Sequence, residues 1–110
     1  MGSEPLLKLR DSYENGWVCL KVAGEVDLSS APQLEHRLQE LRAEKRQVRL
    51  DLSEVRFMDS TGLNILIAAT NDSRRDGWHF EVGQQVSPQV RRLFQAAGVE
   101  RFILTEQHPD

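Results

Sequence analysis

The sequence contains a single cysteine, Cys19, among its 110 residues, so it cannot form an internal disulfide. Three scattered histidines leave too few ligands for a structural zinc site, and we expect no metal and no cofactor. No apolar run approaches the roughly 18 to 20 residues that a membrane span needs, and the N-terminus lacks the apolar core of a signal peptide. We therefore expect a cytoplasmic protein that does not act in the membrane.

The chain also lacks an excess of positive charge, with 14 Lys and Arg against 17 Asp and Glu. The formal net charge is −3, whereas domains that bind nucleic acid directly usually carry an excess of basic residues. Charged residues make up 28% of the chain and hydrophobic residues 39%, which is typical of an ordinary globular domain. We predict one domain over residues 1–110, with residues 1–5 as a flexible arm and residues 105–110 as a polar tail.

Apolar alternation and turn residues indicate several short strands. Asn15-Gly16 is a strong hairpin signal between strands expected over residues 6–10 and 17–23. Three further strands are expected over residues 47–52, 78–83 and 101–104.

Helices are expected between the later strands, with boundary residues typical of helix ends. Ser30-Ala31-Pro32-Gln33 has the form of a capping box with Ser30 as the N-cap. A second helix is predicted over residues 63–76 and ends at Gly77, and a third starts at Ser87-Pro88 and ends at Gly98. The order β-β-α-β-α-β-α-β predicts an α/β fold with a single mixed sheet of about four to five strands.

The stretch MDSTGLNILIAA, residues 58–69, places a polar cluster directly before the most apolar segment. A nucleophile elbow requires glycine two residues before the serine, where this chain has Met58. An aspartic-protease triplet has its hydroxyl and glycine immediately after the aspartate, whereas two residues separate Asp59 from Gly62. Since no residue in the sequence is placed to activate Ser60, we expect no catalytic residue and no enzyme.

Helix capping explains part of this cluster, because Asp, Ser and Thr side chains accept hydrogen bonds from unpaired amides of the first turn. Three such residues exceed what a cap needs, and Gly62 costs a helix roughly 1 kcal/mol relative to alanine. We therefore expect close approach by another molecule at this position. The apolar helix should pack on the sheet and hold a hydroxyl at its exposed N-terminus, where free amides tolerate an added phosphate.

Three blocks of the sequence resemble the STAS domain family, and most closely its bacterial anti-sigma factor antagonists. In chain order they are VAGEVDLSSAPQL, VRFMDSTGLNILIAA and SPQVRRLFQAAGVERF. Together they extend from the second expected strand nearly to the last. The resemblance implies a single STAS domain that regulates transcription by partner switching.

The resemblance also implies a site. In the family, the serine directly after the aspartate is phosphorylated by a partner anti-sigma factor that is also a serine kinase, and here that serine is Ser60. Asp59, Thr61 and Gly62 surround it, and Asp27 corresponds to the aspartate of the family's GE-x-D turn in the partner-binding surface. The unphosphorylated protein would bind the anti-sigma factor and free the sigma factor, and the phosphorylated protein would not.

Two departures from the family pattern bear on partner choice. Asn64 stands where close relatives commonly carry glycine, and the long terminal helix of many members is missing or reduced after Thr105. The sequence leaves open whether a phosphatase resets Ser60. A second hypothesis is a STAS scaffold subunit of a transport ATPase complex, such as a lipid-trafficking complex, although the intact acceptor motif favours the switch.

Overall fold

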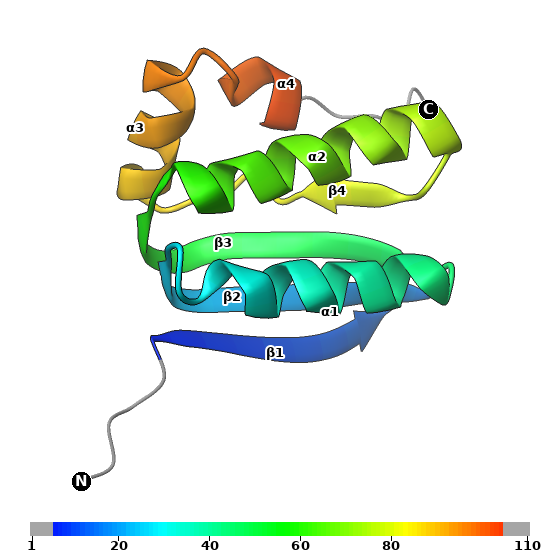
Figure 1. The fold of residues 1–110 in the computed structure, drawn as a ribbon. Coiled ribbons are helices and arrows are strands. Elements are labelled where there is room, and N and C mark those ends of the chain that lie inside the picture. Colours follow the sequence, from blue (N-terminus) through cyan, green and yellow to red (C-terminus); the bar gives the residue numbers. More distant parts are fainter. Residues whose placement is uncertain (1–5, 105–110) are drawn as a thin grey trace, which may run out of the picture.

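In a computed structural model of the protein, residues 6–104 are described, so the predicted flexible arm and polar tail lie outside the described residues. Four strands and four helices follow one another in the order β-β-α-β-α-β-α-α along this range (Figure 1). Their bounds are β1 Leu7–Glu14, β2 Trp17–Val26, α1 Ala31–Ala43, β3 Gln47–Met58, α2 Ser60–Asp76, β4 Phe80–Val82, α3 Pro88–Ala96 and α4 Glu100–Leu104. Within residues 6–104, none of the helices has the length and apolarity needed to cross a bilayer.

The four strands form one mixed sheet in the order β1-β2-β3-β4. β1 and β2 are antiparallel, whereas β2, β3 and β4 run parallel. At the β1–β2 turn, Asn15 and Gly16 have φ values of 51° and 84°, the positive values that a two-residue hairpin turn requires. The predicted hairpin and the predicted mixed α/β sheet are therefore confirmed.

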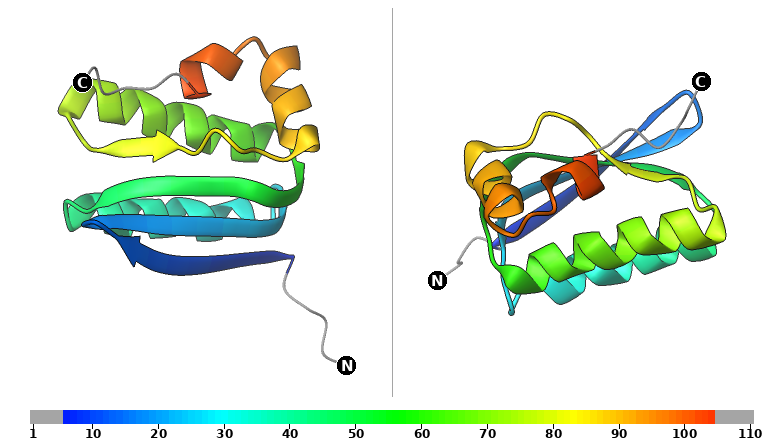
Figure 2. Two further views of the ribbon diagram at one scale, coloured as in Figure 1. Left: turned by 180° about the vertical axis from the view of Figure 1, so that it is seen from behind. Right: turned by 90° about the horizontal axis from the view of Figure 1, so that it is seen from above.

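Helices α1 and α2 lie side by side over one face of the sheet, as the view from above in Figure 2 shows. α3 packs against β3, and α4 contacts α2 and β4. Val18, Leu20 and Val22 alternate along β2 and are all fully buried. Burial of this face under α1 and α2 gives the domain its hydrophobic core.

The strand predicted at residues 101–104 is wrong, because helix α4 occupies this segment. Gly98, with a φ of 70°, turns the chain after α3, and the Ile103 N–H donates to the Val99 carbonyl at 3.0 Å. Ile103 and Leu104 are buried in the resulting helical turn. A short apolar run fits a buried strand and a buried helical turn equally well, and packing against α2 and β4 selects the helix here.

Several element bounds differ from their predictions, and the differences at β2, β3 and α2 affect the site. β2 extends to Val26 and β3 extends to Met58, because the two strands keep pairing in parallel after two register shifts. α2 then starts at Ser60, three residues before the predicted start. β1 is longer than predicted and β4 is shorter. The longer β2 and β3 bring Asp27 and Asp59 to the same end of the sheet.

Candidate functional site

Asp59 caps the N-terminus of α2. Its backbone is extended, and its Oδ1 accepts hydrogen bonds from the N–H groups of Thr61 at 2.9 Å and Gly62 at 3.2 Å. The Leu63 N–H donates to the Asp59 carbonyl at 3.0 Å. The predicted capping role is therefore confirmed. The prediction that free amides face an added phosphate is wrong for Thr61 and Gly62, because the Asp59 side chain already accepts hydrogen bonds from both amides.

Gly62 is required by packing within the protein itself. The residue is buried, and a Cβ atom there would lie 2.7 Å from Val26 Cγ1 and 2.9 Å from Met58 Cγ. The close approach that the sequence suggested for another molecule is thus made by the ends of β2 and β3. A glycine at this position lets α2 begin directly against both strands.

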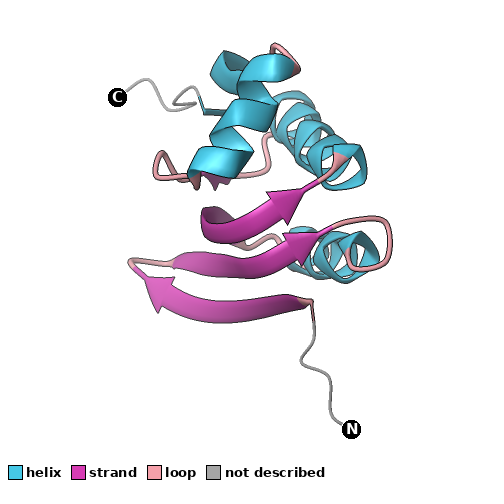
Figure 3. Cartoon of the chain, turned by 90° about the vertical axis from the view of Figure 1, so that its left-hand side faces the viewer, coloured by secondary structure: helices cyan, strands magenta, loops and turns pink. Residues whose placement is uncertain are grey.

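The turn after β2 lies beside the start of α2. The Asp59 N–H donates to the Val26 carbonyl at 3.1 Å, which joins this turn to the start of α2 at the end of the molecule seen in Figure 3. Asp27 Oδ1 accepts hydrogen bonds from Ser29 Oγ at 2.8 Å, from the Ser29 N–H at 3.0 Å and from the Ser30 N–H at 3.1 Å. The Ser29 hydroxyl, followed by the Ser30 N–H, lowers the pKa of the Asp27 carboxyl below its usual value because these bonds favour the charged form.

Ser30 does not cap α1 in the predicted way. Its φ of −102° and ψ of −23° are helical, and its side chain makes no capping hydrogen bond. Instead, Ser30 Oγ donates to the Glu25 carbonyl at 2.7 Å and accepts from the Asp27 N–H at 3.0 Å. The capping-box prediction is wrong because this hydroxyl stabilises the Asp27 turn, which then fixes the start of α1.

The fixed Asp27 turn carries an apolar side chain that sequence analysis missed. Leu28 is 75% exposed, although leucine is among the residues most often buried in folded proteins. A leucine enclosed by the turn-forming residues Asp27 and Ser29 is a sequence signal for this exposure. The neighbouring Ser60 is also exposed, and Thr61 is half-buried. We use the term Ser60 surface for the group Asp27, Leu28, Asp59, Ser60 and Thr61.

The structure therefore brings together four of the five predicted site residues on one accessible surface and places the fifth, Gly62, beneath it. Within residues 6–104, Ser60 Oγ forms no hydrogen bond, and no group of three or more His, Cys, Asp or Glu side chains could hold a metal ion. What the arrangement offers chemically is an accessible hydroxyl on a rigid helix start, beside two carboxylates.

The chain is similar to known proteins over most of its length. A sequence model of the family described as "Mlab, STAS domain" matches residues 14–106. The anti-sigma-B factor antagonist of Bacillus subtilis (strain 168) is 31% identical over 84 residues, which cover 76% of each protein.

Two solved structures share the fold. The anti-sigma factor antagonist SpoIIAA in its unphosphorylated form has a TM-score of 0.70 at 17% identity, covering 86% of this chain and 84% of that chain. The Bacillus cell fate determinant SpoIIAA in the phosphorylated form has a TM-score of 0.65 at 17% identity, with coverage of 87% and 86%. Together with the family match and the Bacillus subtilis relative, these findings show that the chain belongs to the anti-sigma factor antagonists of the STAS domain family.

Proposed function

We propose that the protein antagonises an anti-sigma factor, and that phosphorylation of Ser60 by that factor, acting as a serine kinase, ends the antagonism. The observation that carries this proposal is the exposure of Ser60 at the fixed start of α2, between Asp59 and the amides that Asp59 caps. The unphosphorylated Ser60 surface binds the anti-sigma factor and thereby frees the sigma factor for transcription. A phosphatase acting on the same residue would restore binding.

The contact with the partner combines an apolar anchor with negative charge. Leu28 is held at the tip of a hydrogen-bonded turn, so little conformational entropy is lost when a partner covers it. When a partner covers this side chain, apolar surface is removed from water, which favours association. The carboxylates of Asp27 and Asp59 border it and already accept hydrogen bonds within this chain, so the partner meets a surface that carries negative charge before any phosphate is added.

A phosphate on Ser60 would act on the interface without refolding the protein. It adds about −1.5 to −2 charges at neutral pH. The Thr61 and Gly62 N–H groups already donate to Asp59, so these two amides are not free to bind the phosphate. Most of the added charge would therefore face the partner. SpoIIAA shares this fold in its phosphorylated and its unphosphorylated form, which supports a switch at the surface.

The free-energy cost of placing a phosphate in the interface is large enough to end binding. A hundredfold loss of affinity corresponds to about 2.8 kcal/mol. Burying an uncompensated charge in an interface costs several kcal/mol, and the two neighbouring carboxylates add repulsion. One phosphate at Ser60 can therefore separate the two proteins.

The test uses the purified protein and each anti-sigma factor serine kinase encoded in the source genome. After incubation with Mg-ATP, mass spectrometry should locate phosphate on Ser60, and the phosphorylated protein should no longer form a complex on size-exclusion chromatography. Ser60→Ala is the informative variant and Thr61→Ala its matched control, since Thr61 carries the neighbouring hydroxyl. Undiminished phosphorylation of Ser60→Ala would refute the site.

The alternative function, a scaffold subunit of a transport ATPase complex, gives a different result. Affinity capture from cells with chemical crosslinking would then recover a membrane-complex ATPase instead of a kinase. Ser60→Asp, which places a negative charge at the acceptor position, would be captured as efficiently as the wild-type protein, because no phosphate would control that assembly.

A further inference from the structure

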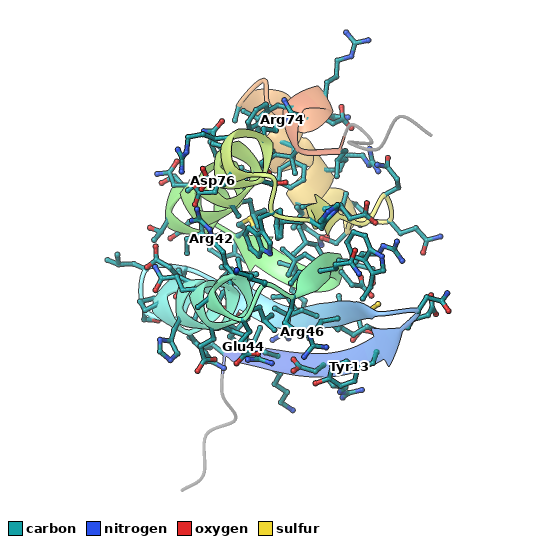
Figure 4. The ribbon with its side chains drawn as sticks, turned by 90° about the vertical axis from the view of Figure 1, so that its right-hand side faces the viewer. Tyr13, Arg42, Glu44, Arg46, Arg74 and Asp76 are labelled. Carbon is teal, nitrogen blue, oxygen red and sulfur yellow. The ribbon has the colours of Figure 1, made fainter. Side chains whose placement is uncertain are left out.

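The end of the molecule opposite the Ser60 surface contains a hollow of about 300 Å³. It opens where α1 and α2 end and β3 begins, and the residues that line it include Arg42, Lys45, Arg46, Asp76 and Trp78. Figure 4 faces this end of the protein and shows Arg42 and Asp76 on the two helices and Arg46 near Tyr13. A hollow of this size is at the lower end of the range that small-molecule sites occupy.

The lining is positively charged in an otherwise acidic protein. Three cationic side chains and one carboxylate line the hollow, whereas the whole chain has a net charge of −3. Arg42 is neutralised locally, because it pairs with Asp72 at 2.6 Å and also with Asp76. Asp76 is paired in addition with Arg75 at 3.0 Å. The remaining positive charge therefore comes from Lys45 and Arg46.

Neither Lys45 nor Arg46 forms an ion pair within residues 6–104. A cation near a helix C-terminus often neutralises the unpaired carbonyls of the last turn. At the end of α1, however, backbone amides occupy two of these carbonyls: the Lys45 N–H donates to Arg42 O at 2.9 Å, and the Arg46 N–H donates to Leu41 O at 3.0 Å. Lys45 is exposed, and the guanidinium of Arg46 lies on the face of the Tyr13 ring, which leaves its N–H groups able to donate to a ligand.

Arg46 and Trp78 are held in place before any ligand arrives, whereas the Lys45 side chain is exposed. The Arg46 guanidinium lies 5.4 Å from the centroid of the Tyr13 ring, and the Trp78 Nε1–H donates to the Arg46 carbonyl at 2.9 Å. The Trp78 ring in turn stacks on Phe80 at 5.0 Å. Arg42 Cζ also lies 6.0 Å from the centroid of the Trp78 ring, so the tryptophan is held by contacts with both Phe80 and Arg42, and a fixed lining lowers the entropic cost of binding.

We propose that this hollow binds a small phosphate-bearing anion, with the phosphate oxygens on Lys45 and Arg46. An ammonium and a guanidinium are the side-chain donors best suited to phosphate oxygens. An organic phosphoester would place its remaining atoms beside the half-buried Trp78 side chain, whereas a free phosphate ion would use the two cations alone. Because the site lies at the other end of the sheet, it is independent of the function proposed for Ser60.

The experiment titrates the full chain at low ionic strength with inorganic phosphate, pyrophosphate and phenyl phosphate. The Trp78 indole N–H resonance, assigned by its loss in Trp78→Phe, reports binding in two-dimensional NMR spectra. We expect a saturable shift, and we expect Lys45→Gln/Arg46→Gln to bind roughly tenfold more weakly or worse, since two partly exposed cations are removed. Tighter binding of phenyl phosphate than of inorganic phosphate identifies an organic phosphoester as the ligand source, and equal binding identifies a free anion.

Arg92→Gln is the matched control, because Arg92 is an exposed arginine on α3 outside the hollow. It should bind like the wild-type protein. Three results would overturn the proposal: no saturable shift with any of the three anions, the same shift with sodium chloride at matched ionic strength, or wild-type affinity in the double variant. Lys45→Gln alone provides a second measurement should the double variant fold poorly, and it should weaken binding by a smaller factor.

Discussion

Replacing Gly62 by alanine should destabilise the protein, although this change favours an ordinary helix by about 1 kcal/mol. The added methyl group would lie 2.7 Å from Val26 Cγ1 and 2.9 Å from Met58 Cγ, closer than carbon atoms pack. Val26 is 0% exposed and Met58 is 6% exposed, so neither side chain can move out into solvent. Overpacking of this kind typically costs about 1–3 kcal/mol, and we expect it to exceed the helix preference, with a net loss of about 1 kcal/mol.

Urea unfolding measures this loss as a lower midpoint with an unchanged dependence on denaturant concentration. Asn64→Ala is the matched control: Asn64 is exposed on the same helix, so its replacement should raise stability slightly. The double variant Val26→Ala/Gly62→Ala should be more stable than the sum of the single changes predicts, because the smaller residue 26 makes room for the methyl group. A Gly62→Ala protein as stable as the wild type would refute the tight junction between α2 and the ends of β2 and β3.

Three further predictions concern the Ser60 surface. Asp59→Ala should lower the free energy of unfolding by about 1 kcal/mol, because the helix loses its capping carboxylate. Asp59→Asn should retain most of the wild-type stability, since its side-chain oxygen can still accept these hydrogen bonds. Equal thermal midpoints for the two variants would contradict the capping role of Asp59. Leu28→Asp should weaken binding to the anti-sigma factor at least tenfold without changing the unfolding midpoint. The matched control is Tyr13→Asp, at a residue that is 64% exposed at the far end of the sheet, and it should bind normally. Equal losses of affinity in both variants would argue against Leu28 as the anchor. The hydrogen bonds that lower the pKa of Asp27 stabilise the folded state fully above the ordinary carboxyl pKa of 3.8. The free energy of unfolding of the wild type should therefore exceed that of Asp27→Asn by a constant amount at higher pH, and this difference should shrink as the pH falls below 3.8. A difference that grows in acid would contradict the lowered pKa.

Local signals predicted the elements that depend on few residues. Asn15-Gly16 specified its hairpin because both residues adopt positive φ readily. Ser87 caps α3 by accepting a hydrogen bond from the Val90 N–H at 3.3 Å, and Gly77 ends α2 in the left-handed conformation, both as predicted. These features are readable from sequence since the interacting groups are neighbours in the chain.

The remaining features depend on contacts between distant segments. Residues 53–58 of β3 lack a strict two-residue alternation, because the register against β2 shifts there, and the strand was therefore predicted to end too early. The reason for Gly62 and the exposure of Leu28 likewise follow from how β2, β3 and α2 meet. The sequence pattern predicted a site around Ser60, but only the packing shows that Asp59 occupies the amides of Thr61 and Gly62.

The most direct test of the account measures how phosphorylation at Ser60 changes affinity for the anti-sigma factor. Isothermal titration calorimetry with the unphosphorylated protein, the enzymatically phosphorylated protein and Ser60→Ala should give two tight complexes and one that is at least about a hundredfold weaker, a difference of about 2.8 kcal/mol. The weak complex should be that of the phosphorylated protein, and its circular dichroism spectrum should match that of the unphosphorylated form. Equal affinity before and after phosphorylation of Ser60 would contradict the account.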